Sequence, residues 1–213
     1  MNFTLFDDTE IFCSGTGGIR QFDLPDATVT LIDNFFTRQE SDYYYNALLE
    51  QTRWREYQMP MYDKIVTAPR MIAWYEDSGN IGVDPSTPAL TDDLHHIRTR
   101  VESGSAHRFN AVLLNLYRNG KDGVAWHSDK TNKSGPDPVI ASVTFGETRL
   151  FRLRHKTRKD IHQVEIPLHH GSFLLMAGTT NSFWEHQVPK TARPVLPRIN
   201  LTFRQVRQRA ETQ

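Results

Sequence analysis

Short runs in which apolar and polar residues alternate dominate the second half of the chain. Alternation with a period of two residues predicts half-buried β-strands. The runs that we expect to form strands are 110–117, 125–129, 139–145, 149–154, 163–167, 172–176, 182–187 and 198–206. Glycine and proline residues separate them, as turns require. About eight short strands at regular spacing predict a sandwich or jelly roll.

The first half of the chain combines two predicted helices with a few extended runs. Thr37 and Glu40 have the spacing of a capping box, which predicts that a helix begins after Thr37. A second helix is predicted by apolar residues at helical spacing, namely Leu90, Leu94, Ile97 and Val101, and Gly104 is expected to end it. Extended runs are expected at 28–32, 54–61, with a break at Pro60, and 69–75, followed by a loop at 76–88.

No linker divides these two halves, so we expect one mainly-β domain with flanking helices over residues 1–213. Within it we expect an irregular arm at 1–25 and an N-terminal extension at 26–105. That extension would carry the helices and a segment that covers a substrate. The jelly-roll core would occupy 106–206.

Composition restricts the class of protein. Hydrophobic residues make up 38% and charged residues 23% of the chain, which allows a packed core. Cys13 is the single cysteine, so no internal disulfide can form, which favours a reducing compartment. No apolar run reaches the ~18 residues of a membrane span, and the first residues do not resemble a secretory signal. We therefore expect a protein that is not secreted and has no membrane partner, cytoplasmic or, in a eukaryote, nuclear.

Charge is distributed unevenly along the chain although the net charge is zero. Residues 1–106 contain 17 acidic and 8 basic residues, and residues 107–213 contain 8 acidic and 17 basic residues. Six of the basic residues lie between Arg149 and Lys159. This segment could follow a phosphate backbone. Alternatively, it could be a solvated strand face that folds back on the acidic half.

Candidate metal ligands occur in Trp126-His127-Ser128-Asp129. Residues two apart in an extended segment point to the same side, so His127 and Asp129 would present an imidazole and a carboxylate together. His186 is available as a third ligand. Two histidines and one carboxylate hold a non-haem Fe(II) ion on one face. A His-x-Asp pair alone is more often surface chemistry or a hydrogen-bonded pair, and no general base for a zinc hydrolase is evident beside it.

A second polar constellation lies near the C-terminus. In the strand expected at 198–206, four polar residues face one side, namely Arg198, Asn200, Thr202 and Arg204. They must face water, as on an exposed edge strand, or an anion. Asn115 and Tyr117 likewise share one side of their strand. Arg198 and Arg204 would be about 20 Å apart along a straight strand, farther than one small diacid can reach.

The order of these motifs resembles that of the AlkB-type nucleic-acid repair dioxygenases over about residues 68–206. The blocks that carry the resemblance are Ala68-Pro-Arg-Met-Ile-Ala-Trp-Tyr75, Asn115-Leu-Tyr117, Trp126-His-Ser-Asp129, Ile140-Ala-Ser-Val-Thr-Phe-Gly146, His170-Gly-Ser-Phe-Leu-Leu-Met176, His186 and Pro197-Arg-Ile-Asn-Leu-Thr-Phe-Arg204. The resemblance implies a double-stranded β-helix, which is a jelly roll. It also implies that Fe(II) binds to His127, Asp129 and His186. For 2-oxoglutarate it implies binding by Asn115, Tyr117, Arg198 and Arg204, supported by Asn200 and Thr202.

The activity implied by the resemblance is oxidative demethylation of N-alkylated bases in single-stranded DNA or RNA. Decarboxylation of 2-oxoglutarate, with O₂ as cosubstrate, would be coupled to hydroxylation of the methyl group and release of formaldehyde. The base must be unpaired or flipped out to react. Arg70, Trp74 and Tyr75 are the candidate substrate contacts, and we expect a monomer. Two alternatives are the same chemistry on a protein or small molecule, and a metal-holding jelly roll without turnover.

Overall fold

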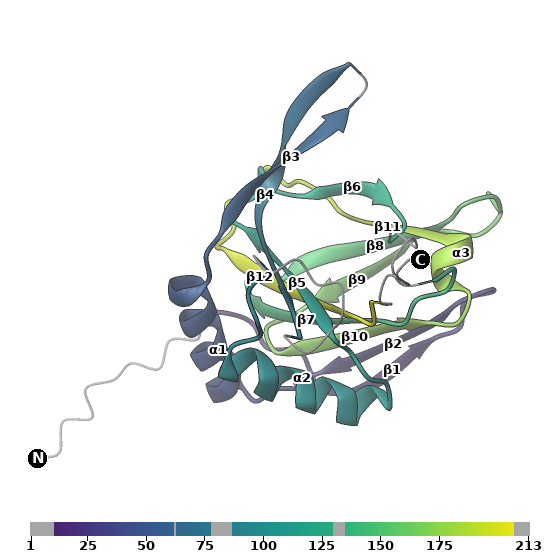
Figure 1. Cartoon of the computed structure of the whole chain (residues 1–213). Coiled ribbons are helices and arrows are strands. Elements are labelled where there is room, and N and C mark those ends of the chain that lie inside the picture. The colour runs from purple at the N-terminus through teal and green to yellow at the C-terminus, as the bar shows by residue number, and fades with distance from the viewer. Residues whose placement is uncertain (1–10, 62, 78–86, 130–134, 207–213) are drawn as a thin grey trace, which may run out of the picture.

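The computed structural model describes residues 11–61, 63–77, 87–129 and 135–206. Two antiparallel sheets face one another in a sandwich (Figure 1). The larger sheet contains, in spatial order, β1 (Gly18–Phe22), β2 (Thr28–Asp33), β10 (Ser172–Ala177), β7 (Ile140–Gly146), β12 (Arg198–Arg204), β5 (Ala111–Tyr117), β4 (Lys64–Glu76) and β3 (Arg55–Met61). The smaller sheet contains β6 (Val124–His127), β11 (Trp184–Val188), β8 (Arg149–His155) and β9 (Val164–Leu168). The predicted mainly-β jelly roll with flanking helices is confirmed.

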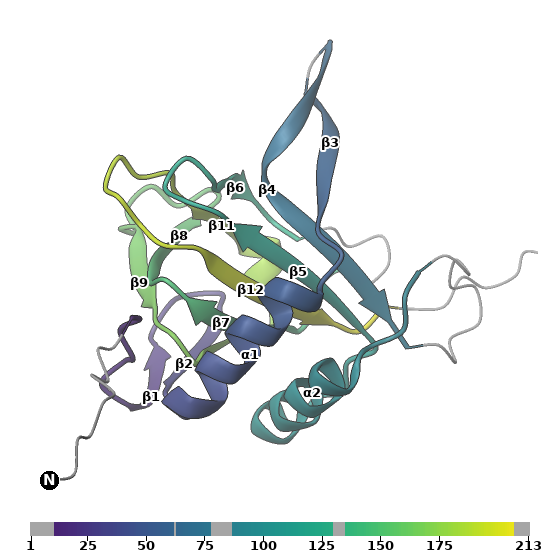
Figure 2. The same ribbon diagram turned by 90° about the vertical axis from the view of Figure 1, so that its left-hand side faces the viewer.

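Two long helices cover the outer face of the larger sheet (Figure 2). They are α1 (Arg38–Gln51) and α2 (Asp92–Ser105), and a short helix, α3 (Thr180–Phe183), precedes β11. The predicted capping box begins α1, because the Glu40 amide donates to Thr37 Oγ1 and the Thr37 amide donates to the Glu40 carboxylate. Among the described residues, no helix has the length and apolar character to cross a membrane.

The alternation along each central strand divides the larger sheet into two different faces. On β12, Ile199, Leu201 and Phe203 are buried in the core beneath the helices. The residues between them face the smaller sheet, where a second apolar cluster includes Phe151 and Trp184. The strand is fully paired, between β7 and β5. The alternative of an exposed edge strand at 198–206 is therefore wrong.

Several predicted boundaries differ from the structure. The predicted irregular arm contains β1, and the segment 26–105 contributes three strands, β2, β3 and β4, to the larger sheet. Gly104 does not end α2, because the helix continues to Ser105 and Ala106 adopts the left-handed conformation that ends it. Gly104 instead leaves room for the Phe35 ring, which would lie 2.7 Å from a Cβ at that position. Most of the predicted loop at 76–88, namely residues 78–86, lies outside the described residues.

The β3–β4 hairpin extends away from the body of the sandwich (Figure 1). Its strands pair from Arg55 with Ile72 to Met61 with Lys64, with an irregularity between Glu56 and Gln58. The strand β3 runs through Pro60 and does not break there. Because β3 is an edge strand, the missing amide hydrogen of proline can face away from the ladder.

Arg149 fixes the turn that leads into β6. It is 4% exposed, and its guanidinium donates to the carbonyl oxygens of Asn119 at 3.3 Å, Asp122 at 2.9 Å and Pro189 at 2.6 Å. These bonds join the turn after β5 to the segment after β11. The start of β6, which leads to His127, is therefore held by a buried cation.

We predict that Arg149→Met lowers the free energy of unfolding by on the order of 3 kcal/mol, because it leaves three carbonyl groups without their charged donor. The matched control is Arg152→Met, which removes a partly exposed ion pair with Glu165 and should cost about 1 kcal/mol or less. Urea denaturation of both variants measures the difference. Equal losses would contradict a structural role for Arg149.

Candidate active site

One face of the larger sheet presents a regular grid of mostly polar side chains toward the smaller sheet. The strands β4, β5 and β12 pair in register, so residues from the three strands stand in rows. The rows on this face are Ile72–Asn115–Asn200, Trp74–Leu113–Thr202 and Glu76–Ala111–Arg204, and Tyr117 pairs with Arg198 in the row beyond Ile72.

The smaller sheet brings the three predicted metal ligands over this grid. His127 on β6 is paired directly with His186 on β11, and Asp129 follows two residues after His127. One ligand atom from each of the three residues lies within 4.8 Å of the others. Two imidazoles and one carboxylate on one side of an ion form the donor set that suits Fe(II) and leaves other positions open.

Local contacts orient both histidines as ligands. The Nδ1 atom of His127 lies 2.8 Å from the Ala125 carbonyl oxygen, so Nδ1 carries a hydrogen and Nε2 is the atom available to a metal. Burial lowers the pKa of His186 to about 4, so its imidazole is neutral at neutral pH. The Phe151 ring stacks on it with centroids 5.1 Å apart.

Asp129 joins the two sheets through an ion pair. Its side chain is buried, and Arg204 of β12 donates to its Oδ1, while Oδ2 lies 3.7 Å from His186 Nε2. Burial alone would raise the pKa of this carboxyl group, but Arg204, His186 and His127 outweigh burial and hold the pKa below its ordinary value. The ligand is therefore a carboxylate at neutral pH.

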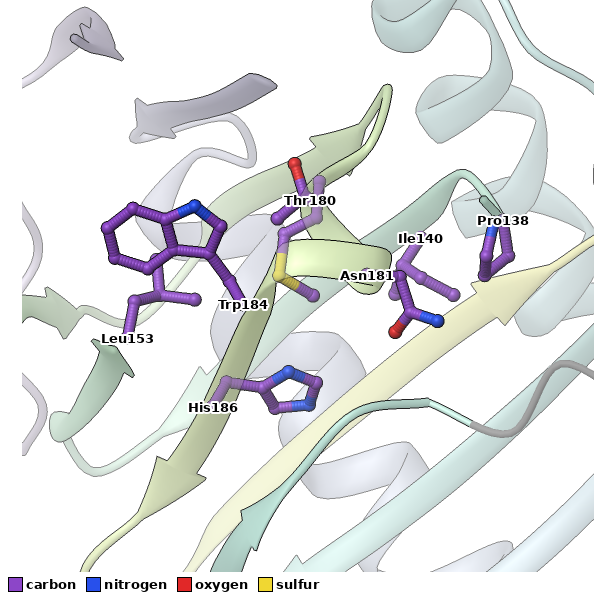
Figure 3. A pocket seen from close by; sticks show the side chains of 8 residues that line it. Pro138, Ile140, Leu153, Thr180, Asn181, Trp184 and His186 are labelled. Carbon is purple, nitrogen blue, oxygen red and sulfur yellow. The ribbon is translucent and has the colours of Figure 1, made fainter. Parts of the chain in front are cut away.

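Asn181, on α3, holds the backbone of Asp129 from both sides, and the sequence analysis did not single it out. Its Oδ1 accepts from the Asp129 amide at 2.8 Å, and its Nδ2 donates to the Asp129 carbonyl at 3.2 Å. Lys156 in turn donates to the Asn181 carbonyl oxygen at 2.8 Å. Asn181 and His186 line the same small cavity (Figure 3), so the residue that holds Asp129 lies close to a second ligand.

The predicted anion-binding residues line one cavity of about 70 Å³ together with the metal ligands. Arg198 is 1% exposed, and its Nη2 donates to Thr144 Oγ1 at 2.8 Å and Asn200 Oδ1 at 2.9 Å. Its Nε and Nη1 atoms are buried and have no hydrogen-bond partner among the described residues, and the same holds for Nε of Arg204. Burial lowers the pKa of Arg198 to about 10, so the guanidinium remains charged at neutral pH. A buried cation with unused donors fits a carboxylate of 2-oxoglutarate.

The separation of the two arginines is consistent with one dianion because they occupy opposite ends of this cavity. Arg204 contacts Asp129 at the metal end, and Arg198 lies beneath the Tyr117 ring, with its guanidinium carbon 5.3 Å from the ring centroid. Asn200 and Thr202, between the two arginines, bond to each other at 2.9 Å. A diacid that reaches the metal with one end would need only Arg198 for its distal carboxylate.

The three predicted substrate contacts differ in their positions. Arg70 lines the cavity and donates from Nε to Asn115 Oδ1 at 2.8 Å. Trp74 is half-buried on the same strand face. The structure contradicts the prediction for Tyr75, because successive residues of a strand alternate and Tyr75 is buried in the core beneath the helices.

The basic segment Arg149–Lys159 does not present a free row of charges. Arg149 is buried, and Arg152 and Arg154 each form an ion pair at 2.7 Å, with Glu165 and Glu185. Arg158 pairs with Asp160 at the same distance. The expectation that this segment could track phosphates loses its support. The alternative that it pairs with the acidic half is also wrong for Arg152, Arg154 and Arg158, because their partners lie in the second half of the chain.

Comparison with known proteins defines the class to which this site belongs. Residues 28–204 match the model of the 2OG-Fe(II) oxygenase superfamily, and the chain belongs to that family. Family membership implies Fe(II), 2-oxoglutarate and O₂ as its requirements.

The relatives narrow the class to AlkB-type oxygenases. The human alpha-ketoglutarate-dependent dioxygenase alkB homolog 3 is 37% identical over 189 residues, which cover 84% of this chain and 66% of the relative. The mouse DNA oxidative demethylase ALKBH2 is 34% identical over 178 residues, with coverage of 79% and 71%. This chain thus spans just under two thirds of the length of the human relative. A solved structure of OsALKBH1 has the same fold, with a TM-score of 0.61 at 16% identity over 87% of this chain and 99% of that one.

We predict that Asn181→Ala raises the dissociation constant for a divalent metal by about tenfold or more, because Asp129 loses the two bonds that orient it. The control is Asn46→Ala on the exposed side of α1. Titration with Co(II), measured by absorbance, reports affinity without any turnover. The same affinity in both variants, with melting temperatures unchanged, would show that Asn181 does not position the ligand.

Proposed function

We propose that the protein is an Fe(II)- and 2-oxoglutarate-dependent dioxygenase that removes alkyl groups from bases of unpaired DNA or RNA. One observation carries the dioxygenase assignment. Two imidazoles and an ionised carboxylate converge at one end of a cavity whose other end contains a buried arginine with donors that have no partner among the described residues. A metal-holding module without turnover needs no such arginine.

The support for a nucleic-acid substrate comes from the relatives. One of them is named a DNA oxidative demethylase. Because the charges of Arg149–Lys159 are paired, this segment no longer argues against a protein or small-molecule substrate. The geometry supports the proposal that the reacting base is unpaired, since a base stacked within a duplex cannot reach a metal between two sheets unless it is flipped out. Monomeric action and a cytoplasmic or nuclear location complete the proposal.

In this proposal each part of the chain has a defined task. When bound, iron with 2-oxoglutarate and O₂ would supply the chemistry that hydroxylates a methyl carbon attached to nitrogen, with 2-oxoglutarate oxidised to succinate and CO₂, and the adduct would then release formaldehyde. His127, Asp129 and His186 hold the metal, and Arg198 with Tyr117 and Asn115 orients the cosubstrate. Arg204 keeps Asp129 ionised. The apolar cluster between the sheets, which includes Phe151, limits the access of water to one side of the site.

The test is an assay with purified protein, Fe(II), 2-oxoglutarate and O₂, offered single-stranded DNA and RNA oligomers that carry methylated adenine or cytosine. Mass spectrometry should show loss of the methyl group, with formaldehyde and succinate as products, and Asp129→Ala should abolish both. Turnover of 2-oxoglutarate with every oligomer left intact would indicate a protein or small-molecule substrate. Absence of any turnover in metal-loaded protein would indicate a binding module.

We predict that Arg198→Lys raises the Michaelis constant for 2-oxoglutarate by about 5- to 150-fold, which corresponds to about 1–3 kcal/mol. Lysine keeps the positive charge but loses the planar fork that can donate to Thr144, Asn200 and a carboxylate together. Arg193→Lys, at an exposed position before β12, is the control. Succinate production at varied 2-oxoglutarate concentration measures both variants, and equal constants would contradict the cosubstrate role of Arg198.

A further inference from the structure

His170 is a buried histidine outside the candidate active site, and both of its ring nitrogens have partners. The residue is 1% exposed. Its Nδ1 atom accepts from the Gly146 amide at 2.8 Å, and its Nε2 atom lies 3.2 Å from Asp42 Oδ1 on α1. Burial lowers the pKa of His170 although Asp42 acts to raise it, so the ring is neutral at neutral pH. A neutral ring that accepts at Nδ1 carries its hydrogen on Nε2 and donates it to Asp42.

The segment that contains His170 holds the last residues of β7. The backbone ladder between β10 and β7 ends at Thr144, whose carbonyl oxygen accepts from the Gly171 amide at 2.8 Å. Beyond that point the His170 ring takes the place of a backbone acceptor for Gly146. A Cβ at Gly171, where φ is +77°, would lie 2.7 Å from the Phe36 carbonyl oxygen. The segment is therefore packed tightly between β7 and the chain that leads into α1.

The same end of β7 supports Arg198. Gly146 pairs directly with Arg198 across the ladder between β7 and β12. The Arg198 guanidinium donates to Thr144 Oγ1 at 2.8 Å. His170 and Gly171 thus bind β7 at two residues, one of which lies opposite Arg198 while the other is bonded to its guanidinium.

A guanidinium binds a carboxylate best when its position is fixed before the ligand arrives. Two donors of Arg198 have no partner among the described residues, and paired bonds to a carboxylate depend on the direction of such donors. The His170 ring is itself fixed, because Phe12 and Phe145 contact it with ring centroids 5.2 and 6.3 Å away. The ring therefore forms a rigid connection between α1 and the end of β7.

We infer that His170 is a positioning residue for 2-oxoglutarate binding, because it fixes the end of β7 on which Arg198 lies. The inference rests on the proposed function, in which Arg198 binds the cosubstrate. It adds a chain of bonds from Asp42 through His170 to Gly146 that supports this arginine from α1. His170 does not line the cavity of the candidate active site. Its effect on the cosubstrate is therefore exerted through β7 and Arg198.

Two substitutions of His170 separate its two bonds. Asparagine places an oxygen near the position of Nδ1 and can still accept from Gly146. Glutamine places an amide nitrogen near the position of Nε2 and can still donate to Asp42. We expect His170→Gln to raise the KM for 2-oxoglutarate by about tenfold, and His170→Asn to keep it near the wild-type value. Succinate production at varied 2-oxoglutarate concentration measures KM and kcat, and kcat at saturation should change little.

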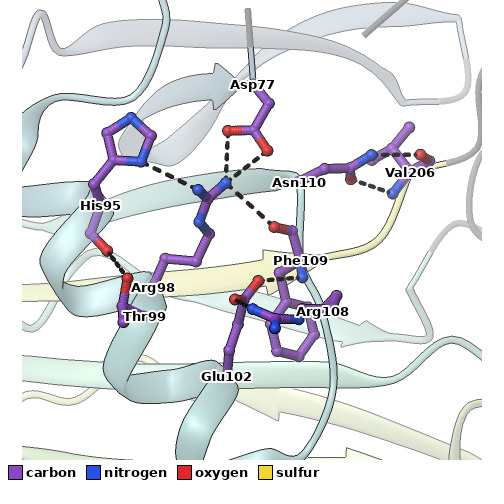
Figure 4. A network of polar contacts seen from close by, with 9 residues as sticks. All are labelled: Asp77, His95, Arg98, Thr99, Glu102, Arg108, Phe109, Asn110 and Val206. Carbon is purple, nitrogen blue, oxygen red and sulfur yellow. Dashed lines mark hydrogen bonds and ion pairs between the residues drawn. The ribbon is translucent and has the colours of Figure 1, made fainter. Parts of the chain in front are cut away.

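The matched control is Arg98→Met, which removes an ion pair in another part of the fold. Arg98 Nη1 donates to both carboxylate oxygens of Asp77, at 2.5 and 2.6 Å, just beyond the end of β4 (Figure 4). The strands β5 and β12 separate β4 from β7. This variant should melt at a lower temperature, as both His170 variants should, but it should keep the wild-type KM for 2-oxoglutarate.

Asp42 provides a second test at a partly exposed position, where substitution is compatible with folding. Asp42→Leu removes the acceptor of His170 Nε2, so the hydrogen can move to Nδ1, and in that tautomer the bond from the Gly146 amide is lost. We expect Asp42→Leu to raise the KM for 2-oxoglutarate. Asp42→Asn should keep the wild-type value, because its side-chain oxygen can still accept from Nε2.

Three results would overturn the inference. A wild-type KM in His170→Gln, or equal values in His170→Gln and His170→Asn, would show that the bond to Gly146 does not act on the cosubstrate. A rise of the same size in Arg98→Met would assign the effect to a general loss of stability. Each of these results leaves the proposed function intact, which fails instead if wild type consumes no 2-oxoglutarate.

Discussion

The contact between Asp129 and Arg204 is the interaction on which the candidate site depends. Asp129 lies two residues beyond the end of β6 in the smaller sheet, and Arg204 is the last residue of β12, a central strand of the larger sheet. A buried carboxylate is costly without a cation, so this pair fixes how the two sheets approach each other at their open side. The same carboxylate lies beside His127 and His186. Burial of His186 keeps its imidazole neutral at neutral pH. One charged contact thus joins the sheets and keeps the carboxylate ligand ionised.

Because successive side chains of a strand point to opposite faces, the larger sheet has an apolar face under the helices and a polar face toward the smaller sheet. On β12 the apolar residues Ile199, Leu201 and Phe203 anchor the helices, while the alternate positions carry a polar stripe toward the smaller sheet. Buried polar stripes are stable when their members bond to one another, as Asn200 and Thr202 do. Arg198 departs from this rule, because two of its donors have no partner among the described residues. That departure lies where a ligand would complete the interactions.

Much of this arrangement follows from the sequence. Alternation predicted the strands of the jelly roll, and the Thr37–Glu40 spacing predicted the start of α1. The order of the motifs predicted the candidate metal and cosubstrate residues, and the structure places all of them along one cavity. The partners of charged groups could not be predicted, because they depend on register: Arg152 and Arg154 meet Glu165 and Glu185 across β8, β9 and β11. Tyr75 was misassigned although alternation separates it from Trp74, because the sequence does not say which face is buried. Asn181 lies on a single helical turn directly before the run 182–187, which alternation predicted as a strand.

The central claim is that the metal triad and the buried arginine form one site, so Fe(II) and 2-oxoglutarate should bind cooperatively. Anaerobic calorimetric titration of 2-oxoglutarate into metal-free and Fe(II)-loaded protein measures this coupling directly. The account predicts that Fe(II) tightens 2-oxoglutarate binding and that 2-oxoglutarate tightens Fe(II) binding by the same factor. Equal affinities with and without the metal would contradict it, because the two ligands would then occupy independent sites.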